Sequence, residues 1–184
     1  MGQEGNFPPE KCIIPLLFSR EAVLPSLYAE IERNFGPIDY ISREIPFSYS
    51  SYYNEEMGPE IRRIFLGLKE LIDPGQLWRI KKNTNRIEAA FAASPGKISA
   101  KGSGRTVNLD PGLLDLNHLV LGTTKHAGHR IPLSEGIYAE ITLHYRHGRF
   151  EPLSWTYPDY RSEEYQKILL ELREIFHNQL KHHS

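Results

Sequence analysis

The spacing of apolar residues along the chain indicates helices in four places. Pro25 suits the first turn of a helix, and the apolar residues around it stop before Gly36-Pro37. Asp73 suits the N-cap of a later helix, with Pro74 at its first position. Each stretch repeats apolar residues every three or four positions, which is typical of one buried helix face. The pattern predicts about four helices, over residues 24–35, 59–72, 74–91 and 163–180.

Other segments alternate apolar and polar residues, as strands with one buried face do. The clearest is Ile137 to Arg146, in which Glu140 lies among polar residues opposite an apolar face. His147-Gly148 then allows a tight reversal, so a hairpin is expected. Residues 48–58 and 94–104 are rich in small and polar residues and are predicted to be loops. The other predicted strands cover residues 11–19, 38–47, 105–110, 116–125 and 149–153.

The order of these elements favours one fold class. Several strands follow one another in the second half, and the helices are set apart from them, which is typical of α+β folds rather than doubly wound parallel sheets. We therefore predict a mainly antiparallel sheet with about four helices largely on one side of it. Residues 1–10 are predicted to form a flexible N-terminal arm, residues 11–180 a single α+β domain, and residues 181–184 a frayed tail.

Composition narrows the classes of protein that fit. The chain has 184 residues, 40% of them hydrophobic, which suffices for one core. Its 22 basic and 23 acidic residues give a net charge of -1, so binding to nucleic acid is not favoured. The only cysteine, Cys12, excludes an intrachain disulfide. No signal segment or membrane-length apolar stretch is found, and we predict a cytoplasmic protein with no membrane partner.

Several common catalytic signatures are missing. The phosphate loop G-x-x-x-x-G-K-[ST] does not occur, nor do G-x-G-x-x-G, G-x-S-x-G or H-E-x-x-H. Lys101 to Gly104 is rich in glycine but lacks the preceding strand and following helix that make a phosphate cradle. No standard motif therefore assigns a reaction, and whether the chain is an enzyme is left open.

Polar side chains gather instead at the ends of strands and in the loops that join them, mostly in the second half. We expect them to surround one polar cleft on the C-terminal half of the sheet. The residues predicted to be catalytic are Glu140, His129 and Asp110. The residues predicted to bind a ligand are Lys125, Arg130, Asn108, Thr124, Tyr52, Glu56 and Asp159.

These residue types suit a small anionic ligand, such as a phosphate ester or a nucleotide. Lys125 and Arg130 would neutralise its charge, and arginine offers a bidentate fork. Glu140 would be a general base, a metal ligand or the partner in a structural ion pair. His126 and His129 could share a divalent metal, but Gly128 between them disfavours the helical turn that this needs. The cofactor is thus left open, with a divalent metal among the candidates.

Other features keep a second function open. The tracts Tyr49–Tyr53 and Trp155–Tyr160 either cap the core or wall a ligand pocket. If their aromatic side chains are exposed, the chain would be a non-catalytic protein-interaction module. The polar face formed by Thr142, His144 and Arg146 is predicted to face solvent, with a polar cleft as the alternative.

Seven sets of motifs are distinctive when taken together: Phe35 to Asp39, Tyr52-Tyr53 with Glu56 to Gly58, Leu71 to Gly75, Asn108 to Gly112, Thr123 to Lys125 with His129-Arg130, Gly136 to Glu140, and Trp155 to Tyr160. In these motifs the chain resembles one bacterial family, that of the domain of unknown function DUF4416. Some of its members carry the label GTP-binding protein, but this chain lacks both the phosphate loop and the N-K-x-D guanine motif. The resemblance implies one domain from about Lys11 to Leu180 and no established activity.

Overall fold

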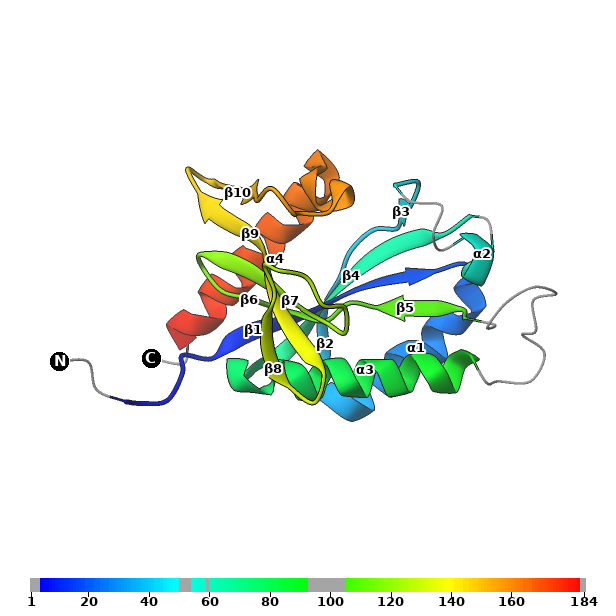
Figure 1. The fold of residues 1–184 in the computed structure, drawn as a ribbon, viewed down its shortest axis with the longest axis horizontal. Helices are drawn as coiled ribbons and strands as arrows, with labels where there is room; N and C mark the ends of the chain where they lie inside the picture. Colours follow the sequence, from blue (N-terminus) through cyan, green and yellow to red (C-terminus); the bar gives the residue numbers. More distant parts are fainter. Residues whose placement is uncertain (1–3, 50–53, 59, 93–104, 183–184) are drawn as a thin grey trace.

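The computed structural model describes residues 4–49, 54–58, 60–92 and 105–182. Within them, ten strands form one antiparallel sheet, with the order β10-β9-β7-β6-β1-β4-β2 along its main path (Figure 1). Three short strands lie off this path: β3 beside β4, β5 beside β1 and β8 beside β9. The strands are β1 (Glu10–Phe18), β2 (Ile38–Ile41), β3 (Ile45–Pro46), β4 (Arg62–Ile72), β5 (Val107–Leu109), β6 (Gly112–Leu114), β7 (His118–Thr123), β8 (Ile131–Ser134), β9 (Ile137–Arg146) and β10 (Arg149–Pro152).

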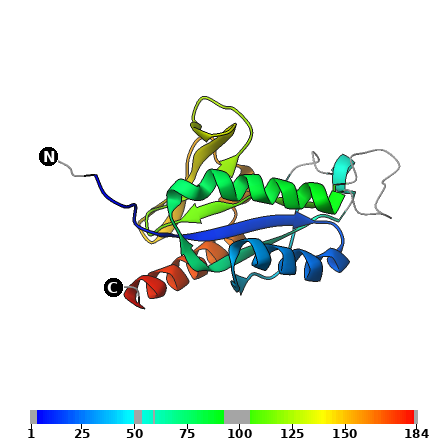
Figure 2. The ribbon, with the colours of Figure 1, turned by 90° about the horizontal axis from the view of Figure 1, so that it is seen from below.

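In the described part of the chain, three long helices cover the two faces of this sheet. They are α1 (Leu24–Phe35), α3 (Leu77–Ala92) and α4 (Glu163–His182), while α2 (Asn54–Met57) is a single turn. The buried residues of α1 and α3 join one core cluster, and those of α4 join another on the opposite face (Figures 1 and 2). The fold is therefore α+β with an antiparallel sheet, as predicted. The prediction of about four helices largely on one side is wrong, because α4 covers the second face.

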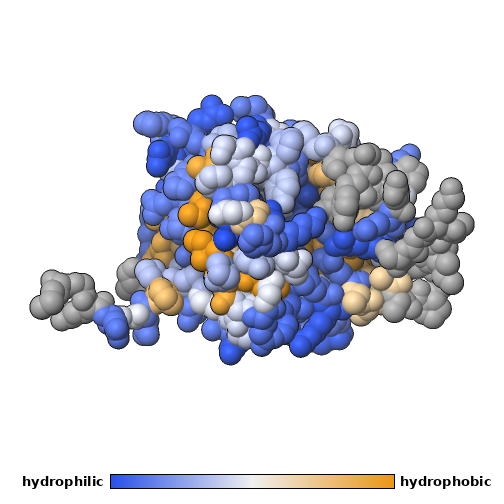
Figure 3. Space-filling view, in the orientation of Figure 1, coloured by the Kyte–Doolittle hydropathy of each residue, from blue (hydrophilic) through white to orange (hydrophobic). Residues whose placement is uncertain are grey.

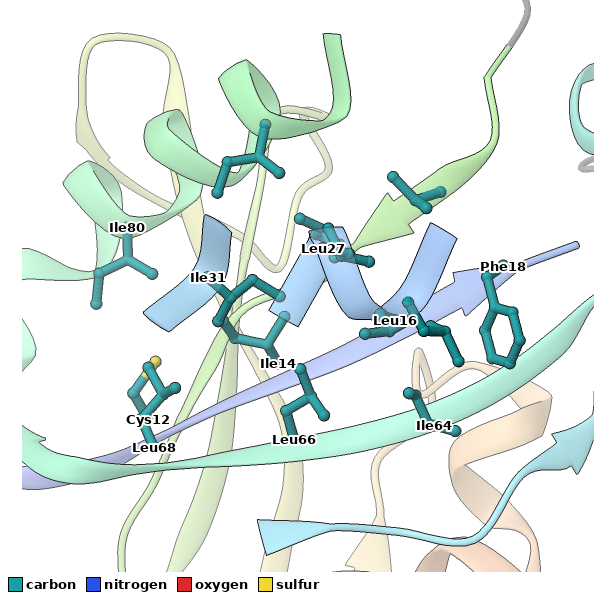
Figure 4. Close-up of a cluster of buried hydrophobic side chains, with 14 of the residues drawn as sticks. Cys12, Ile14, Leu16, Phe18, Leu27, Ile31, Ile64, Leu66, Leu68 and Ile80 are labelled. Atoms are coloured by element: carbon teal, nitrogen blue, oxygen red, sulfur yellow. The ribbon is translucent and has the colours of Figure 1, made fainter. Parts of the chain in front are cut away.

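The central strand β1 shows what this two-sided covering requires. Cys12, Ile14 and Leu16 point to α1 and α3 (Figure 4), whereas Ile13 packs in the cluster of α4. A strand that is buried on both faces reads as a continuous apolar run and not as an alternation. Burial also raises the pKa of the Cys12 thiol to about 12. No reactive role is therefore expected for Cys12.

The second predicted helix, over residues 59–72, is the largest error at the level of secondary structure. Residue 59 lies outside the described residues, and β4 occupies most of the remainder. Ile64 and Leu66 face one core cluster while Phe65 faces the other. Apolar residues on both faces satisfy helical spacing by accident, because a short continuous run fits either period. Here the neighbouring strands β1 and β2 decide the conformation.

The sheet divides where β5 gives way to β6. Both strands pair with β1: β5 with the half that ends at Phe18, and β6 with the half that begins at Lys11. The strand β7 then pairs with β6 and leads the sheet on to β9. Asp110 lies at the division, and its backbone N–H donates to the carbonyl of Pro15 at 2.9 Å. This division opens a space between β5 and the end of β7.

Two further predictions concern the ends of the chain and its relation to membranes. The helix α4 reaches His182, so the start of the predicted tail is helical, and residues 1–3 and 183–184 lie outside the described residues. The division into arm, domain and tail stays a prediction. In the described part of the chain, no helix has the length and apolar character needed to cross a membrane.

Glu10, at the start of β1, gives a test of the fold by pH. Burial and the nearby charge of Asp115 raise the pKa of Glu10 from 4.5 to about 7. The folded chain therefore holds this proton more tightly than the unfolded chain, and stability falls as pH rises from 4.5 to about 7. We expect Glu10→Gln to raise the free energy of unfolding by about 1 to 2 kcal/mol near about pH 8, after allowance for screening, and by little near about pH 4. Urea denaturation at both pH values measures this difference, and an equal gain at both would contradict it.

Candidate functional site

A cavity of about 510 Å³ lies at the division of the sheet. Its walls come from β4, α3, β5, the end of β7, β9 and the short helix η3 (Pro158–Arg161). Among the described residues, both signs of charge contribute to the lining. The cationic side chains are Arg63, Lys81, Arg105, Lys125 and Arg130, and the acidic ones are Glu88, Asp110, Glu140 and Asp159.

Most of the residues predicted from the sequence lie at this cavity. Glu56 and His129 are not part of the lining, but each contacts a residue that is: Glu56 pairs with Arg105 at 3.3 Å, and His129 with Glu140 at 2.9 Å. Tyr52 lies outside the described residues. The predicted residues that line the cavity are Asn108, Asp110, Thr124, Lys125, Arg130, Glu140 and Asp159.

Arg63 of β4 is the most deeply buried cation of the lining, with 3% of its side chain exposed. Its two terminal nitrogens donate long hydrogen bonds to Asp110, at 3.3 Å, and to Asp159, at 3.4 Å. Its Nε has no hydrogen-bond partner among the described residues, and neither has the hydroxyl of Tyr160. A buried guanidinium normally uses more of its five donors than this. The described residues thus satisfy the donors of Arg63 only in part.

The environment of Arg63 keeps it charged. Burial alone would lower the pKa of Arg63, but Tyr165, Tyr160 and the two carboxylates outweigh this effect and raise it. Burial raises the pKa of Asp159, and Arg63 offsets part of that rise. Burial likewise raises the pKa of Tyr160, so this phenol keeps its proton and remains a donor.

Glu140 forms a second polar corner of the cavity. It lies on β9 opposite Leu121 and is 2% exposed. Its Oε2 accepts hydrogen bonds from Arg130 Nε at 2.6 Å and from His129 Nε2 at 2.9 Å. Arg130 also donates to the carbonyl of Lys125 and to the hydroxyl of Tyr157, both at 2.8 Å. Burial lowers the pKa of Arg130, but Glu140 reverses this and raises it overall.

The third side of the cavity is held by α3. Glu88 accepts from the backbone N–H of Leu109 at 2.7 Å and pairs with Arg105 at 2.6 Å. Lys81 donates to the carbonyl of Leu109 at 2.7 Å. Arg105 also donates to Asn108. These contacts join α3 to β5 and fix the charged groups before any ligand binds.

Aromatic side chains complete the wall. Phe47, Tyr49, Tyr157 and Tyr160 line the cavity, and the guanidinium of Arg63 lies 5.4 Å from the centroid of the Phe47 ring. Trp155 is outside the lining. Its ring stacks on His129 with centroids 4.8 Å apart, and its Nε1 donates to the carbonyl of Ile141 at 2.9 Å.

The prediction that Thr142 faces solvent is wrong. Its side chain is fully buried and donates to the carbonyl of Glu140 at 3.3 Å. The cause is a register shift between β7 and β9, where Leu119 pairs with Leu143 but Val120 with Ile141. Such a bulge interrupts the alternation of faces. By contrast, Arg146 at the end of the strand is exposed.

Among the described residues, four charged ones at the cavity were missed by sequence reasoning: Arg63, Lys81, Glu88 and Arg105. Two signals were available. Arg62 and Arg63 interrupt an otherwise mainly apolar run from Ile61 to Leu68, where a buried charge requires a partner or a function. Lys81, Asn85 and Glu88 follow one another at helical spacing, which predicts a polar stripe on α3 beside its apolar one.

His126 and His129, which the sequence disfavours as a shared metal site, have different partners. His126 packs edge-on against Tyr138, while His129 bonds to Glu140. The part of the chain that is described holds no group of three or more His, Cys, Asp or Glu side chains that could bind a metal ion. The candidates for ligand contact are thus the poorly satisfied Arg63 and the rigid carboxylate of Glu140.

The fold and this cavity define the protein as an α+β chain with charged groups set around an opening in its sheet. A family model described as a domain of unknown function, DUF4416, matches residues 8–176, and the chain belongs to that family. The resemblance seen in the sequence is thereby confirmed. No curated protein and no solved structure matches the chain.

Proposed function

We propose that the cavity binds a small anionic ligand, a phosphate ester or a nucleotide, on the C-terminal half of the sheet. The observation that carries this proposal is Arg63. It is a buried cation with two long hydrogen bonds, and its Nε lacks an acceptor among the described residues. Unsatisfied buried donors are costly, so an arriving oxyanion gains more here than in water.

The surroundings of Arg63 support an anion rather than a neutral acceptor. The hydroxyl of Tyr160 is a further donor without an acceptor within the described chain. Lys81 is a second cation beside Asp110, with its Nζ 4.0 Å from the carboxylate. The unpartnered atoms expose almost no surface, so the ligand would reach them through a small shift of the side chains above them.

The size and walls of the cavity support a ligand larger than an inorganic ion. About 510 Å³ is within the range of sites for small organic molecules. Tyr157 and Tyr49 are each about two-fifths exposed and line the same cavity, where a sugar or a planar ring would pack. A phosphate ester combines an oxyanion with such a body.

The alternative is a protein-interaction module. On the face seen in Figure 3, apolar side chains gather mainly over the region of β7, β8 and β9, among polar ones. Ile131 and Leu133 of β8 are exposed and would contribute to such a surface. However, Trp155 and Tyr157 use their polar atoms within the chain, which favours a role at the rim of the cavity.

A thermal-shift panel of inorganic phosphate, sugar phosphates and nucleotides, with and without Mg²⁺, tests the proposal. A ligand at a hundred times its dissociation constant stabilises the fold by about 2.7 kcal/mol. For a chain of this length that raises the Tm by roughly 5 to 10 °C. No shift with any member of the panel would remove the proposal and leave the alternative. Catalysis, a divalent metal, a cytoplasmic location and a bacterial source stay predictions.

Tyr160→Phe tests where the anion binds. The hydroxyl that it removes has no partner in the described chain, so we expect unchanged or slightly higher stability in urea. Loss of one donor to an oxyanion should weaken binding of the best phosphate compound by about tenfold. Tyr145→Phe is the control, because Tyr145 packs on Phe150 outside the cavity lining. If both variants bind the compound equally well, the anion does not contact the hydroxyl of Tyr160.

A further inference from the structure

One oxygen of the buried Glu140 carboxylate has no hydrogen-bond partner among the residues described. This is Oε1; the residue lines the cavity and is 2% exposed. The other oxygen, Oε2, accepts from both Arg130 and His129. A buried carboxylate oxygen without a donor is costly, because it has given up water and gained nothing in exchange.

The carboxylate is also held in one orientation. Arg130 bonds to Glu140, Lys125 and Tyr157 with its three nitrogens. The His129 ring is clamped by its stacking on Trp155, and Trp155 is itself bonded to the backbone of β9. Rotation of Glu140 to serve Oε1 would therefore break its contacts at Oε2. The described residues thus fix the Glu140 carboxylate in the cavity and donate hydrogen bonds to only one of its two oxygens.

Arg63 and Glu140 thus present opposite demands in one cavity. Arg63 Nε is a donor that lacks an acceptor, and Glu140 Oε1 is an acceptor that lacks a donor, within the part of the chain described. A ligand that is only an anion would satisfy the first and repel the second. A ligand with an anionic group and a separate donor would satisfy both.

We infer that the ligand is a phosphate ester that carries a hydroxyl or N–H group, and that this group donates a hydrogen bond to Glu140 Oε1. This inference rests on the proposed function and adds the feature of the ligand that the site selects. A ligand without the donor binds less tightly, because it fills the cavity and leaves the carboxylate oxygen without a hydrogen bond. Sugar phosphates, through hydroxyls, and nucleotides, through base or ribose donors, share this chemistry.

Calorimetric titration of the full chain with two kinds of probe tests the inference. Methyl phosphate has no donor outside its phosphate group, whereas glycerol phosphate and nucleoside monophosphates have several. We expect the best donor-bearing probe to bind at least about tenfold more tightly than methyl phosphate, because a hydrogen bond to a charged group has that effect. In Glu140→Gln this advantage should disappear: the donor-bearing probes lose the charged acceptor, and methyl phosphate binds as tightly as before or more tightly, because the repelling charge is gone.

Glu151→Gln is the matched control, since Glu151 lies on the adjacent strand β10 and bonds to His147 outside the cavity. A urea melt of each variant shows that it folds, and Arg130 keeps two of its partners when Glu140 changes. If Glu140→Gln weakens both kinds of probe equally, or neither, the inference is overturned. Equal affinity of wild type for both kinds would overturn it while leaving the proposed function intact. If no phosphate compound binds the wild type, both fall together.

Discussion

Arg63→Met is expected to lower the free energy of unfolding by about 3 kcal/mol, because it leaves two carboxylates without their shared cation. Asp159 is 7% exposed and would be a buried charge without a strong partner. Asp110 is 29% exposed and keeps some water, so the loss lies at the lower end of the range for broken buried pairs. Methionine fills a similar volume, which keeps the cavity term small.

The neighbouring residue supplies the control for this prediction. Arg62 has a side chain that is 32% exposed and pairs with Glu44 at 2.6 Å, so Arg62→Met should cost less than about 1 kcal/mol. The loss in Arg63→Met should grow as pH rises, because unpaired buried carboxylates hold their protons more tightly in the folded chain. Guanidinium melts near about pH 5 and about pH 8 measure both effects. Similar losses of stability in the two variants would show that the ion pairs of Arg63 stabilise the fold no more than the exposed pair of Arg62 does.

Sequence reasoning succeeded where one face of an element is polar. The helices α1, α3 and α4 each have one buried stripe, and β9 was predicted with its observed ends, Ile137 and Arg146. It failed at β4, whose two buried faces remove the alternation on which the prediction depends. Because β1 and β4 are apolar on both faces, their sequences do not indicate which face α4 covers.

Short strands were missed for a different reason. The strand β6 has only three residues, and β8 is exposed along its length, so neither shows an apolar period. Pairing with β1 and with β9 creates them, and such pairing between distant segments leaves no local signal. The division of the sheet at Asp110 is thus a tertiary feature, and it could not be foreseen from Asn108 to Gly112 alone.

The candidate site was predictable in its second half and not in its first. Asp110 and Arg130 stand in clusters of polar residues beside strand ends, and Glu140 stands on the polar side of the alternation in β9. Arg63, with Arg62 beside it, stands in a mainly apolar run whose spacing predicts a helix, so the sequence does not join Arg63 to its partners Asp110 and Asp159. Long-range ion pairs of this kind depend on which strands become neighbours.

Gly112→Ala should disturb both the fold and the cavity, because Gly112 is the residue of β6 at which the sheet divides. An added Cβ would lie 2.6 Å from a methyl carbon of Leu121 and 2.7 Å from the backbone oxygen of Val120. The methyl group can turn aside, but the backbone oxygen belongs to the paired strand β7 and moves only with it. We expect a loss of about 2 to 3 kcal/mol in the free energy of unfolding, net of the entropy that alanine removes from the unfolded chain.

The same substitution should weaken binding of phosphate compounds, since β7 carries the lining from Leu121 to Thr123 and leads to Lys125. Gly128→Ala is the control: its added Cβ would meet nothing within 4 Å, and it should leave the stability and binding unchanged. Urea melts of both variants, followed by calorimetric titration with the best phosphate compound, measure the two effects. Normal stability in Gly112→Ala would mean that β6 and β7 separate easily. That result would contradict the claim that the sheet is rigid at this division and holds Asp110 and Glu140 in fixed positions.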